Sequence, residues 1–122
     1  MFNIKNAYEV VAERQEGPFT IEFAWAPEYA QLELMFDPQE DYFDELVEKL
    51  GDGTWTHFIA RVRVLHDGKE MGVDYLGSCI AADPAEWFEK NPDGYVDDMI
   101  NTAREEAQTY VKKMLEDFKF SG

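Results

Sequence analysis

The chain has 122 residues, of which 45% are hydrophobic and 15% aromatic, enough apolar surface to fold residues 1–122 as one globular domain. It carries 26 aspartate and glutamate residues against 11 lysine and arginine residues, a formal net charge of -15. Direct binding to nucleic acid or to an anionic membrane surface is therefore disfavoured, because both need clustered cationic side chains.

The N-terminal residues 1–15 lack the charged and then apolar run of a signal peptide, and we leave their secondary structure unassigned. No apolar stretch of the sequence approaches the roughly 20 residues that a membrane span needs. Cys79 is the only cysteine and lies in the apolar context "YLGSCIAA", which is typical of a small core residue in a reducing compartment. We therefore expect a cytoplasmic protein.

Apolar residues alternate along two neighbouring segments, 19–25 and 29–36, in the period-two pattern of half-buried strands. The short sequence "APE" separates them as a plausible turn, so we expect the two segments to pair as a hairpin. The alternating residues are Phe19, Ile21, Phe23 and Trp25 in the first segment and Leu32, Leu34 and Phe36 in the second.

A helix is predicted next, because Asp37, Pro38 and Glu40 form a helix-start signature. The aspartate would cap free amides, the proline would occupy the first helical position, and the glutamate would reach back from the third. Gly51 is well placed to end this helix. Its apolar residues recur at spacings of three and four, which predicts burial of Tyr42 or Phe43, Leu46, Val47 and Leu50.

Residues 56–82 predict a second hairpin, in which Asp67 and Gly68 supply a turn that needs positive φ angles. Its first strand, "HFIARVRV", is also a candidate edge for pairing with a second copy of the chain. Asp83 and Pro84 then repeat the helix-start chemistry for a short helix, which the sequence "NPDG" interrupts.

The last helix is predicted from one apolar stripe that continues for about six turns. The resulting element order, ββαββαα, predicts an α+β fold: an antiparallel sheet of about four strands, built from two hairpins, with two to three helices packed on one face. The stripe consists of Val96, Met99, Ile100, Ala103, Ala107, Tyr110, Val111, Met114, Leu115 and Phe118.

Motifs for catalysis, for a cofactor and for a metal are missing from the sequence. There is no glycine-rich phosphate loop, and the "DGTW" and "DGYVDD" stretches lack the alternating ligands of a calcium loop. His57 and His66 lie on opposite faces of a strand pattern and are poor candidates for a shared metal. A nucleophile pair of Cys79 with either histidine stays a disfavoured alternative. We therefore expect no enzyme, no cofactor and no metal site.

Negative charge is concentrated in two segments of the chain. Residues 37–52 hold seven carboxylates against one lysine, and residues 83–98 hold six against one lysine, so that together they supply -11 of the net charge of -15. Four of the carboxylates recur three and four residues apart on the first helix, where like charges repel. The candidate partner-binding residues are Glu40, Asp41, Asp44, Glu45, Glu48, Asp52, Glu86, Glu89, Asp93, Asp97 and Asp98.

Acidic surfaces often serve solubility alone, and that interpretation stays open here. The functional interpretation is that the two acidic segments present carboxylates in place of phosphates to a basic nucleic-acid-binding partner protein. In size, acidity and lack of a catalytic motif, the chain resembles the small phage- or mobile-element-encoded inhibitors of host defence, the anti-restriction and anti-CRISPR proteins, several of which mimic nucleic acid. The resemblance implies a stoichiometric blocker without turnover. A monomer and a homodimer are both compatible with the sequence.

Two alternatives to a host-defence inhibitor remain. One is an immunity protein or antitoxin that plugs the active site of a basic nuclease toxin. The other is a small-ligand-binding domain, or an enzyme, whose site lies in the aromatic-rich sheet at Trp25, Trp55, Tyr75 or Trp87. Interface energy usually comes from a few apolar anchors, and the candidates beside the acidic segments are Phe43, Trp87 and Tyr95.

Overall fold

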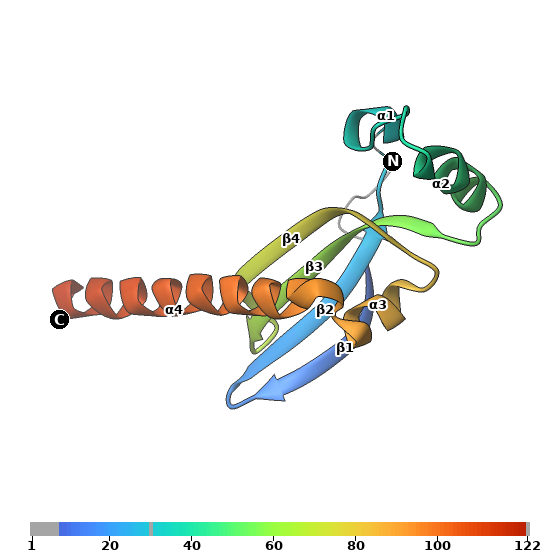
Figure 1. Ribbon diagram of the computed structural model, residues 1–122. Coiled ribbons are helices and arrows are strands. Elements are labelled where there is room, and N and C mark those ends of the chain that lie inside the picture. Colours follow the sequence, from blue (N-terminus) through green and yellow to red (C-terminus); the bar gives the residue numbers. More distant parts are fainter. Residues whose placement is uncertain (1–7, 30, 122) are drawn as a thin grey trace, which may run out of the picture.

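The computed structural model describes residues 8–29 and 31–121, the last three of these by their backbone alone. Four strands form one antiparallel sheet in the order β1-β2-β3-β4, which confirms the predicted α+β class and antiparallel sheet (Figure 1). The strands are β1 (Glu9–Glu16), β2 (Phe19–Pro27), β3 (Thr56–His66) and β4 (Lys69–Ala81). The helices are α1 (Leu32–Met35), α2 (Tyr42–Gly51), α3 (Pro84–Lys90), the 3-10 helix η2 (Pro92–Gly94) and α4 (Tyr95–Ser121).

The predicted hairpin between residues 19–25 and 29–36 is wrong. β2 pairs with β1 on one edge and with β3 on the other, where Phe23 lies opposite Val62, so no edge of β2 is free for a further strand. The segment "LELM" instead forms α1, because leucine, glutamate and methionine favour helix and none of them is β-branched. β1 lies mostly within residues 1–15, left unassigned from the sequence, and residues 1–7 are outside the described part.

The predicted helix start at Asp37, Pro38 and Glu40 is also wrong. The Asp37 carboxylate accepts a hydrogen bond from the Gln39 amide at 2.9 Å and so stabilises a turn. α2 begins only after Asp41, which occupies the N-cap position without a side-chain hydrogen bond. Asp37, Pro38 and Glu40 therefore lie in the successive turns between α1 and α2 and do not start the helix. Gly51 is the last residue of α2, as expected.

The predicted hairpin of residues 56–82 is confirmed, with Asp67 at φ 50° and Gly68 at φ 79° in its turn. The second helix start is confirmed as well, since the Asp83 carboxylate accepts a hydrogen bond from the Ala85 amide at 3.0 Å. α3 ends at Lys90, and the left-handed backbone of the next residue, Asn91, breaks the helix at "NPDG". The Asn91 side-chain oxygen then accepts a hydrogen bond from the Val96 amide at 2.8 Å, within the first turn of α4.

β3 is a central strand, so the expectation that "HFIARVRV" forms a sheet edge is wrong. Each of its residues from Phe58 to Leu65 faces β2 on one side, and β4 pairs along its other side. β1 and β4 are the two edges of the sheet among the described residues.

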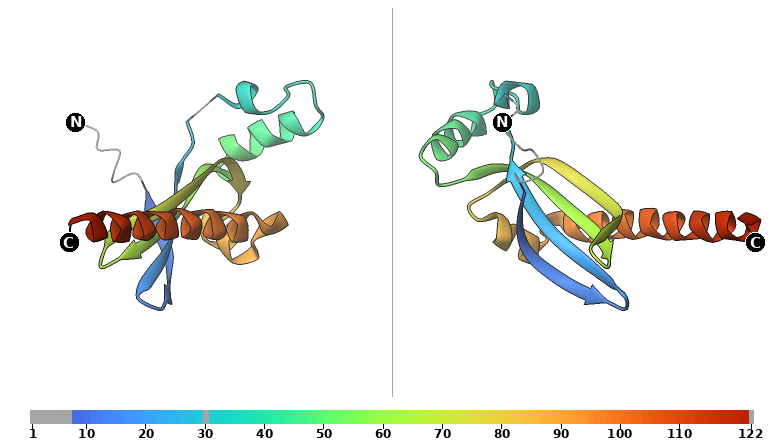
Figure 2. Two further views of the ribbon diagram at one scale, coloured as in Figure 1. Left: turned by 90° about the vertical axis from the view of Figure 1, so that its left-hand side faces the viewer. Right: turned by 180° about the vertical axis from the view of Figure 1, so that it is seen from behind.

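The hydrophobic core lies between one face of the sheet and the helices α3 and α4 (Figure 2). α1 and α2 instead lie beyond the end of the sheet at which β3 begins (Figure 1). The prediction of helices on one face therefore holds for α3 and α4 and not for α1 and α2. The sheet contributes Ile21, Phe23, Phe58, Ala60, Val62, Val64 and Cys79 to the core, and the helices contribute Trp87, Phe88, Val96, Met99, Ile100, Ala103 and Ala107.

α4 crosses β4 at close range because residue 72 is a glycine. A Cβ atom at position 72 would lie 2.1 Å from the carbonyl oxygen of Ala103 and 2.8 Å from the amide nitrogen of Ala107. Both helix residues are themselves small and buried. The backbones of helix and strand are thus in direct contact at this point, and α4 is fixed across the sheet there.

The apolar stripe of the last helix is fully buried only as far as Ala107. α4 continues past the sheet into solvent (Figures 1 and 2). Met114 is 51% exposed, Leu115 58% and Phe118 78%. The periodicity of the stripe predicted an amphipathic helix correctly, but it does not tell whether another element lies against each turn.

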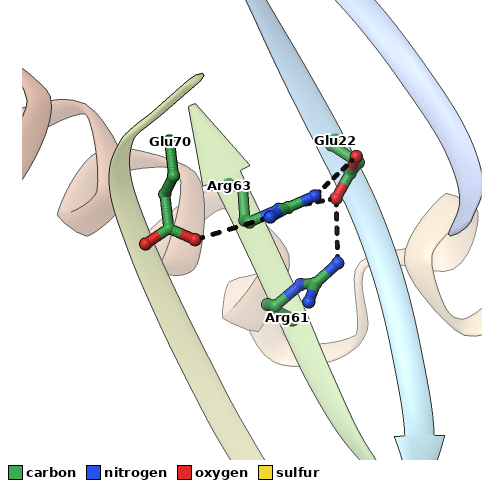
Figure 3. Close-up of polar contacts among 4 residues, drawn as sticks. All are labelled: Glu22, Arg61, Arg63 and Glu70. Carbon is green, nitrogen blue, oxygen red and sulfur yellow. Dashed lines mark hydrogen bonds and ion pairs between the residues drawn. The ribbon is translucent and has the colours of Figure 1, made fainter. Parts of the chain in front are cut away.

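The face of the sheet opposite α4 carries an ion-pair network around Glu22, which is only 5% exposed (Figure 3). Its carboxylate accepts hydrogen bonds from Arg63 Nε at 2.8 Å and Arg63 Nη2 at 3.1 Å, and from Arg61 Nη2 at 3.0 Å. Glu70 lies 3.6 Å from the same Arg63 guanidinium. The guanidinium of Arg61 stacks over the ring of Tyr8 at 4.3 Å. One buried carboxylate therefore holds two guanidinium groups in place.

Candidate partner-binding surface

All eleven acidic residues singled out from the sequence have exposed side chains, in two groups. The first ridge lies on α2 and its flanks, and the second lies on α3, η2 and the first turn of α4. The first ridge consists of Glu40, Asp41, Asp44, Glu45, Glu48 and Asp52, and the second consists of Glu86, Glu89, Asp93, Asp97 and Asp98.

The first ridge follows from the amphipathic pattern of α2. Phe43 and Leu46 are buried, and the carboxylates at intervening positions are consequently turned to solvent. Asp44 and Glu45 lie in the first turn, where the helix dipole offsets part of their repulsion. Glu48 is beyond that turn, and the dipole does not account for it. The chain therefore keeps adjacent like charges on this helix beyond what capping and the dipole explain.

Asp52 ends the first ridge in a fixed orientation. Its carboxylate accepts a hydrogen bond from the Thr54 amide at 2.8 Å. Hydrogen bonding by Thr54 lowers the pKa of the Asp52 carboxyl below its ordinary value, so the group is ionised at neutral pH.

Several carboxylates of the second ridge are stabilised by interactions with nearby residues and with the helix dipole. Glu86 forms an ion pair with Lys90 one turn along α3, and Asp97 accepts a hydrogen bond from the Asn91 side-chain amide at 2.8 Å. Asp97 and Asp98 also lie in the first turn of α4, where the helix dipole stabilises negative charge. The fold itself thus explains more of the second ridge than of the first, and the first ridge is the stronger candidate for a binding surface.

Both ridges are attached to one end of the β3–β4 hairpin. Thr56, at the start of β3, pairs with Ala81, at the end of β4. The first ridge ends four residues before this pair at Asp52, and α3 begins directly after it with the Asp83 cap. The hairpin therefore anchors both acidic segments at the same end of the sheet, although they are far apart in the sequence.

Several cations of the chain are paired with carboxylates elsewhere in the fold. Arg61 and Arg63 are bound by Glu22, and Arg104 forms an ion pair with Glu16. Among residues 8–29 and 31–121, no lysine or arginine forms an ion pair with a carboxylate of the first ridge. Its charge is left for solvent or a partner.

Exposed apolar side chains lie on α2, which carries the first ridge, and on α1, which precedes it in the chain. Leu34 is 79% exposed, and Tyr42 and Val47 on α2 are about half exposed. Val47 had been predicted to be buried, and that prediction is wrong. Sequence reasoning missed Leu34 because the segment was assigned to a strand with this residue on its inner face. An exposed apolar residue beside carboxylates is a typical anchor for a protein partner.

Of the three anchors expected from the sequence, only Tyr95 is exposed. Phe43 is buried under α2, and Trp87 is buried between α3 and the sheet. These two side chains stabilise the segments that carry the ridges and are not available to a partner.

Of the four aromatic residues proposed for a ligand site, Trp87 belongs to the core and Trp25 packs against it, whereas Trp55 and Tyr75 do not. Trp25 packs edge-on against Phe58 with ring centroids 6.2 Å apart, and Trp87 packs against the same ring at 5.6 Å. Tyr75 is half exposed beside Tyr8 on the other face. A pocket of about 510 Å³ lies between the end of β4 and α3, and of the four residues only Trp87 lines it. The four aromatic residues therefore do not converge on one cavity.

Cys79 is buried in the core, where desolvation raises the pKa of its thiol to about 11. The thiol donates a weak hydrogen bond to the Leu76 carbonyl oxygen at 3.4 Å. Burial also lowers the pKa of His57 below its ordinary value, so this imidazole is neutral at pH 7. The protonated thiol is a poor nucleophile.

We expect Cys79 in the folded protein to react with a disulfide reagent at least roughly 100-fold more slowly than an exposed thiol, because so little thiolate is present and the sulfur is buried. The measurement is the reaction rate of the variant Thr109→Cys, which adds an exposed cysteine on α4 as an internal control. One fast and one slow phase are expected, and two fast phases would contradict the buried position of Cys79.

Comparison of the chain with protein-family models, with curated proteins and with solved structures gave no match. Among residues 8–29 and 31–121, no group of three histidine, cysteine or carboxylate side chains is arranged to hold a metal ion. Within the same residues, no helix combines the length and the apolar character of a membrane span. The candidate surface must therefore be interpreted from its own geometry and charge.

Proposed function

We propose that the protein is a non-enzymatic acidic inhibitor that binds the basic nucleic-acid-binding surface of a partner protein and thereby excludes nucleic acid. The observation that carries this proposal is the exposure of eleven carboxylates in two ridges at one end of a single sheet. A basic groove made for phosphates would recognise such a surface, and complementary fields would speed the encounter.

The biological setting that fits this activity is inhibition of host defence by a phage or mobile element, in the cytoplasm, as in anti-CRISPR and anti-restriction proteins. The likeness to those inhibitors lies in size and charge. Repulsion within the first ridge opposes folding of the free protein, and a basic partner would relieve it. That relief supplies a physical reason for the chain to keep the ridge.

The test is a pair of variants with equal net charge. In the ridge variant, Asp41, Asp44, Glu45 and Glu48 are replaced with lysine, and in the control variant the same reversal is made at exposed positions on β1 and α4, namely Glu9, Glu13, Glu105 and Glu106. Each protein is used to capture partners from a lysate at low and at raised salt, and the captured protein is then challenged with DNA and RNA.

We expect the native protein and the control variant to capture a basic protein that nucleic acid displaces, and raised salt to weaken the complex. We expect the ridge variant to lose affinity by on the order of 100-fold, because like charges then face each other. Equal capture by both variants would assign the interaction to another surface or to net charge alone. Capture that nucleic acid does not displace would contradict occupation of a nucleic-acid site.

An immunity protein or antitoxin would use the same surface, since a nuclease toxin also has a basic active-site cleft. The captured protein separates the two settings. A partner that is toxic when produced alone and harmless together with this chain would indicate an antitoxin, whereas a subunit of a defence complex would indicate a host-defence inhibitor.

A further inference from the structure

The C-terminal half of α4 exposes several large apolar side chains to solvent. α4 has 27 residues, which corresponds to a length of about 40 Å, and Ala107 is its last residue in the hydrophobic core. Beyond that residue lies the segment that we call the overhang, residues 108–121. Its apolar stripe follows on from the buried one at helical spacing, and it consists of Val111, Met114, Leu115 and Phe118.

A groove lies where the overhang leaves the sheet. The volume of this groove is about 560 Å³, and Phe19, Val64, Ala107, Val111 and Leu115 provide its apolar lining. Its charged lining residues are Lys112 and the ion pair of Arg104 with Glu16. The exposed stripe and the groove share Val111 and Leu115, so together they form one continuous apolar surface.

The charge of this region differs from that of the rest of the chain. Residues 108–122 contain three lysines against Glu116 and Asp117, a net charge of +1. The other 107 residues have a net charge of -16, which together gives the total of -15. α4 also runs away from both acidic ridges, since its C-terminus lies at the side of the molecule opposite α2 and α3 (Figure 1). The overhang is therefore the surface at which a second, equally acidic chain meets the least repulsion.

We propose that the overhangs of two copies of the chain pair antiparallel about a two-fold axis. Each overhang covers the apolar stripe of the other copy and extends toward the groove of that copy. The two stripes overlap most fully when the helices cross at the centre of the stripe, between Met114 and Leu115. An antiparallel pair keeps the acidic ridges at opposite ends of the dimer, whereas a parallel pair would place them side by side. An interface of this kind is isologous and closes without further growth.

Dimerisation and partner binding respond to salt in opposite directions. Salt screens the repulsion between two bodies of like charge, so we expect the dimer to become tighter as salt is raised. Binding of a basic partner to the ridges weakens under the same change. The pairing of α4 is also independent of the proposed function, because none of the ridge residues belongs to the overhang.

The first test is sedimentation equilibrium of the full chain from micromolar to millimolar concentration. We expect a monomer–dimer equilibrium whose dissociation constant rises at least about 100-fold in the double variant Leu115→Ser and Phe118→Ser. The matched control is Glu116→Ser, on the opposite side of the same turns, which should leave the equilibrium unchanged apart from a small charge effect. A native protein that stays monomeric over this range, or a double variant that dimerises as well as the native protein, would overturn the proposal.

The second test uses cross-linking, because Cys79 is buried and leaves an engineered cysteine as the reactive thiol. We expect Leu115→Cys, close to the two-fold axis, to form a disulfide-linked dimer under mild oxidation. Thr109→Cys, on the opposite side of α4, should not. Equal cross-linking of both variants, or cross-linking of Thr109→Cys alone, would show that α4 does not pair through its apolar stripe.

Discussion

Replacing Gly72 with alanine is expected to lower the free energy of unfolding by at least about 3 kcal/mol, the upper part of the range for an overpacked core. The added methyl group would lie 2.1 Å from the Ala103 carbonyl oxygen, and the opposing atoms belong to helix backbone, which has no rotamer to change. α4 must move away from β4 as a unit, and the core between them opens. Urea unfolding of native protein and variant measures the difference.

Gly51→Ala is the matched control for this substitution. Gly51 is the last residue of α2, and nothing lies within 4 Å of a Cβ atom at that position. A glycine-to-alanine change in a helix without steric conflict stabilises by roughly 0.5 to 1 kcal/mol. If Gly72→Ala were as harmless as Gly51→Ala, the close crossing of α4 over β4 would be contradicted.

Replacing Glu22 with glutamine is expected to lower the free energy of unfolding by about 3 to 5 kcal/mol, because it leaves two largely buried guanidinium groups without their counter-charge. The matched control is Glu70→Gln, which removes a second and more exposed partner of Arg63 at 3.6 Å. That change should cost no more than about 1 kcal/mol, as is usual for exposed ion pairs. Equal effects of the two variants would show that the network around Glu22 contributes little to stability.

The contribution of Glu22 should also depend on pH. Desolvation raises the pKa of its carboxyl, but hydrogen bonds and charges of Arg63 and Arg61 outweigh it, and the folded-state pKa lies below the ordinary value of 4.5. A group with a lowered pKa stabilises the fold above its unfolded pKa and loses that contribution as pH falls through its folded pKa. The stability difference between native protein and Glu22→Gln should therefore be full at neutral pH and shrink below about pH 4.5. A constant difference down to acid pH would contradict this assignment.

Local chemistry allowed parts of the fold to be predicted from the sequence. The Asp67-Gly68 turn, the Asp83 cap and the break after Asn91 each depend on one or two residues whose conformational preference the rest of the chain does not override. The exposure of the acidic residues was predictable for a similar reason, since an unpaired carboxylate is rarely buried.

The elements that were not predicted correctly from the sequence depend on contacts between distant parts of the chain. β1 has almost no apolar alternation, because it is an edge strand with most of its side chains in solvent, and only pairing with β2 identifies it as a strand. The alternation at Leu32, Leu34 and Phe36 suggested a strand, yet no strand position was free beside β2. Periodicity likewise showed that α4 has an apolar face but not that the buried part of this face ends at Ala107.

The connection between β2 and β3 has a consequence for how this protein can change over time. These strands are antiparallel neighbours, and the chain leaves the sheet at Pro27 and returns opposite it at Phe58. The Glu28 amide even donates a hydrogen bond to the His57 carbonyl oxygen at 3.0 Å, which closes the base of the excursion. A short turn would satisfy the same pairing, so the segment with α1, α2 and the first ridge is topologically an insertion. Its length, charge and apolar residues are thus open to variation, while the register of the sheet stays the same.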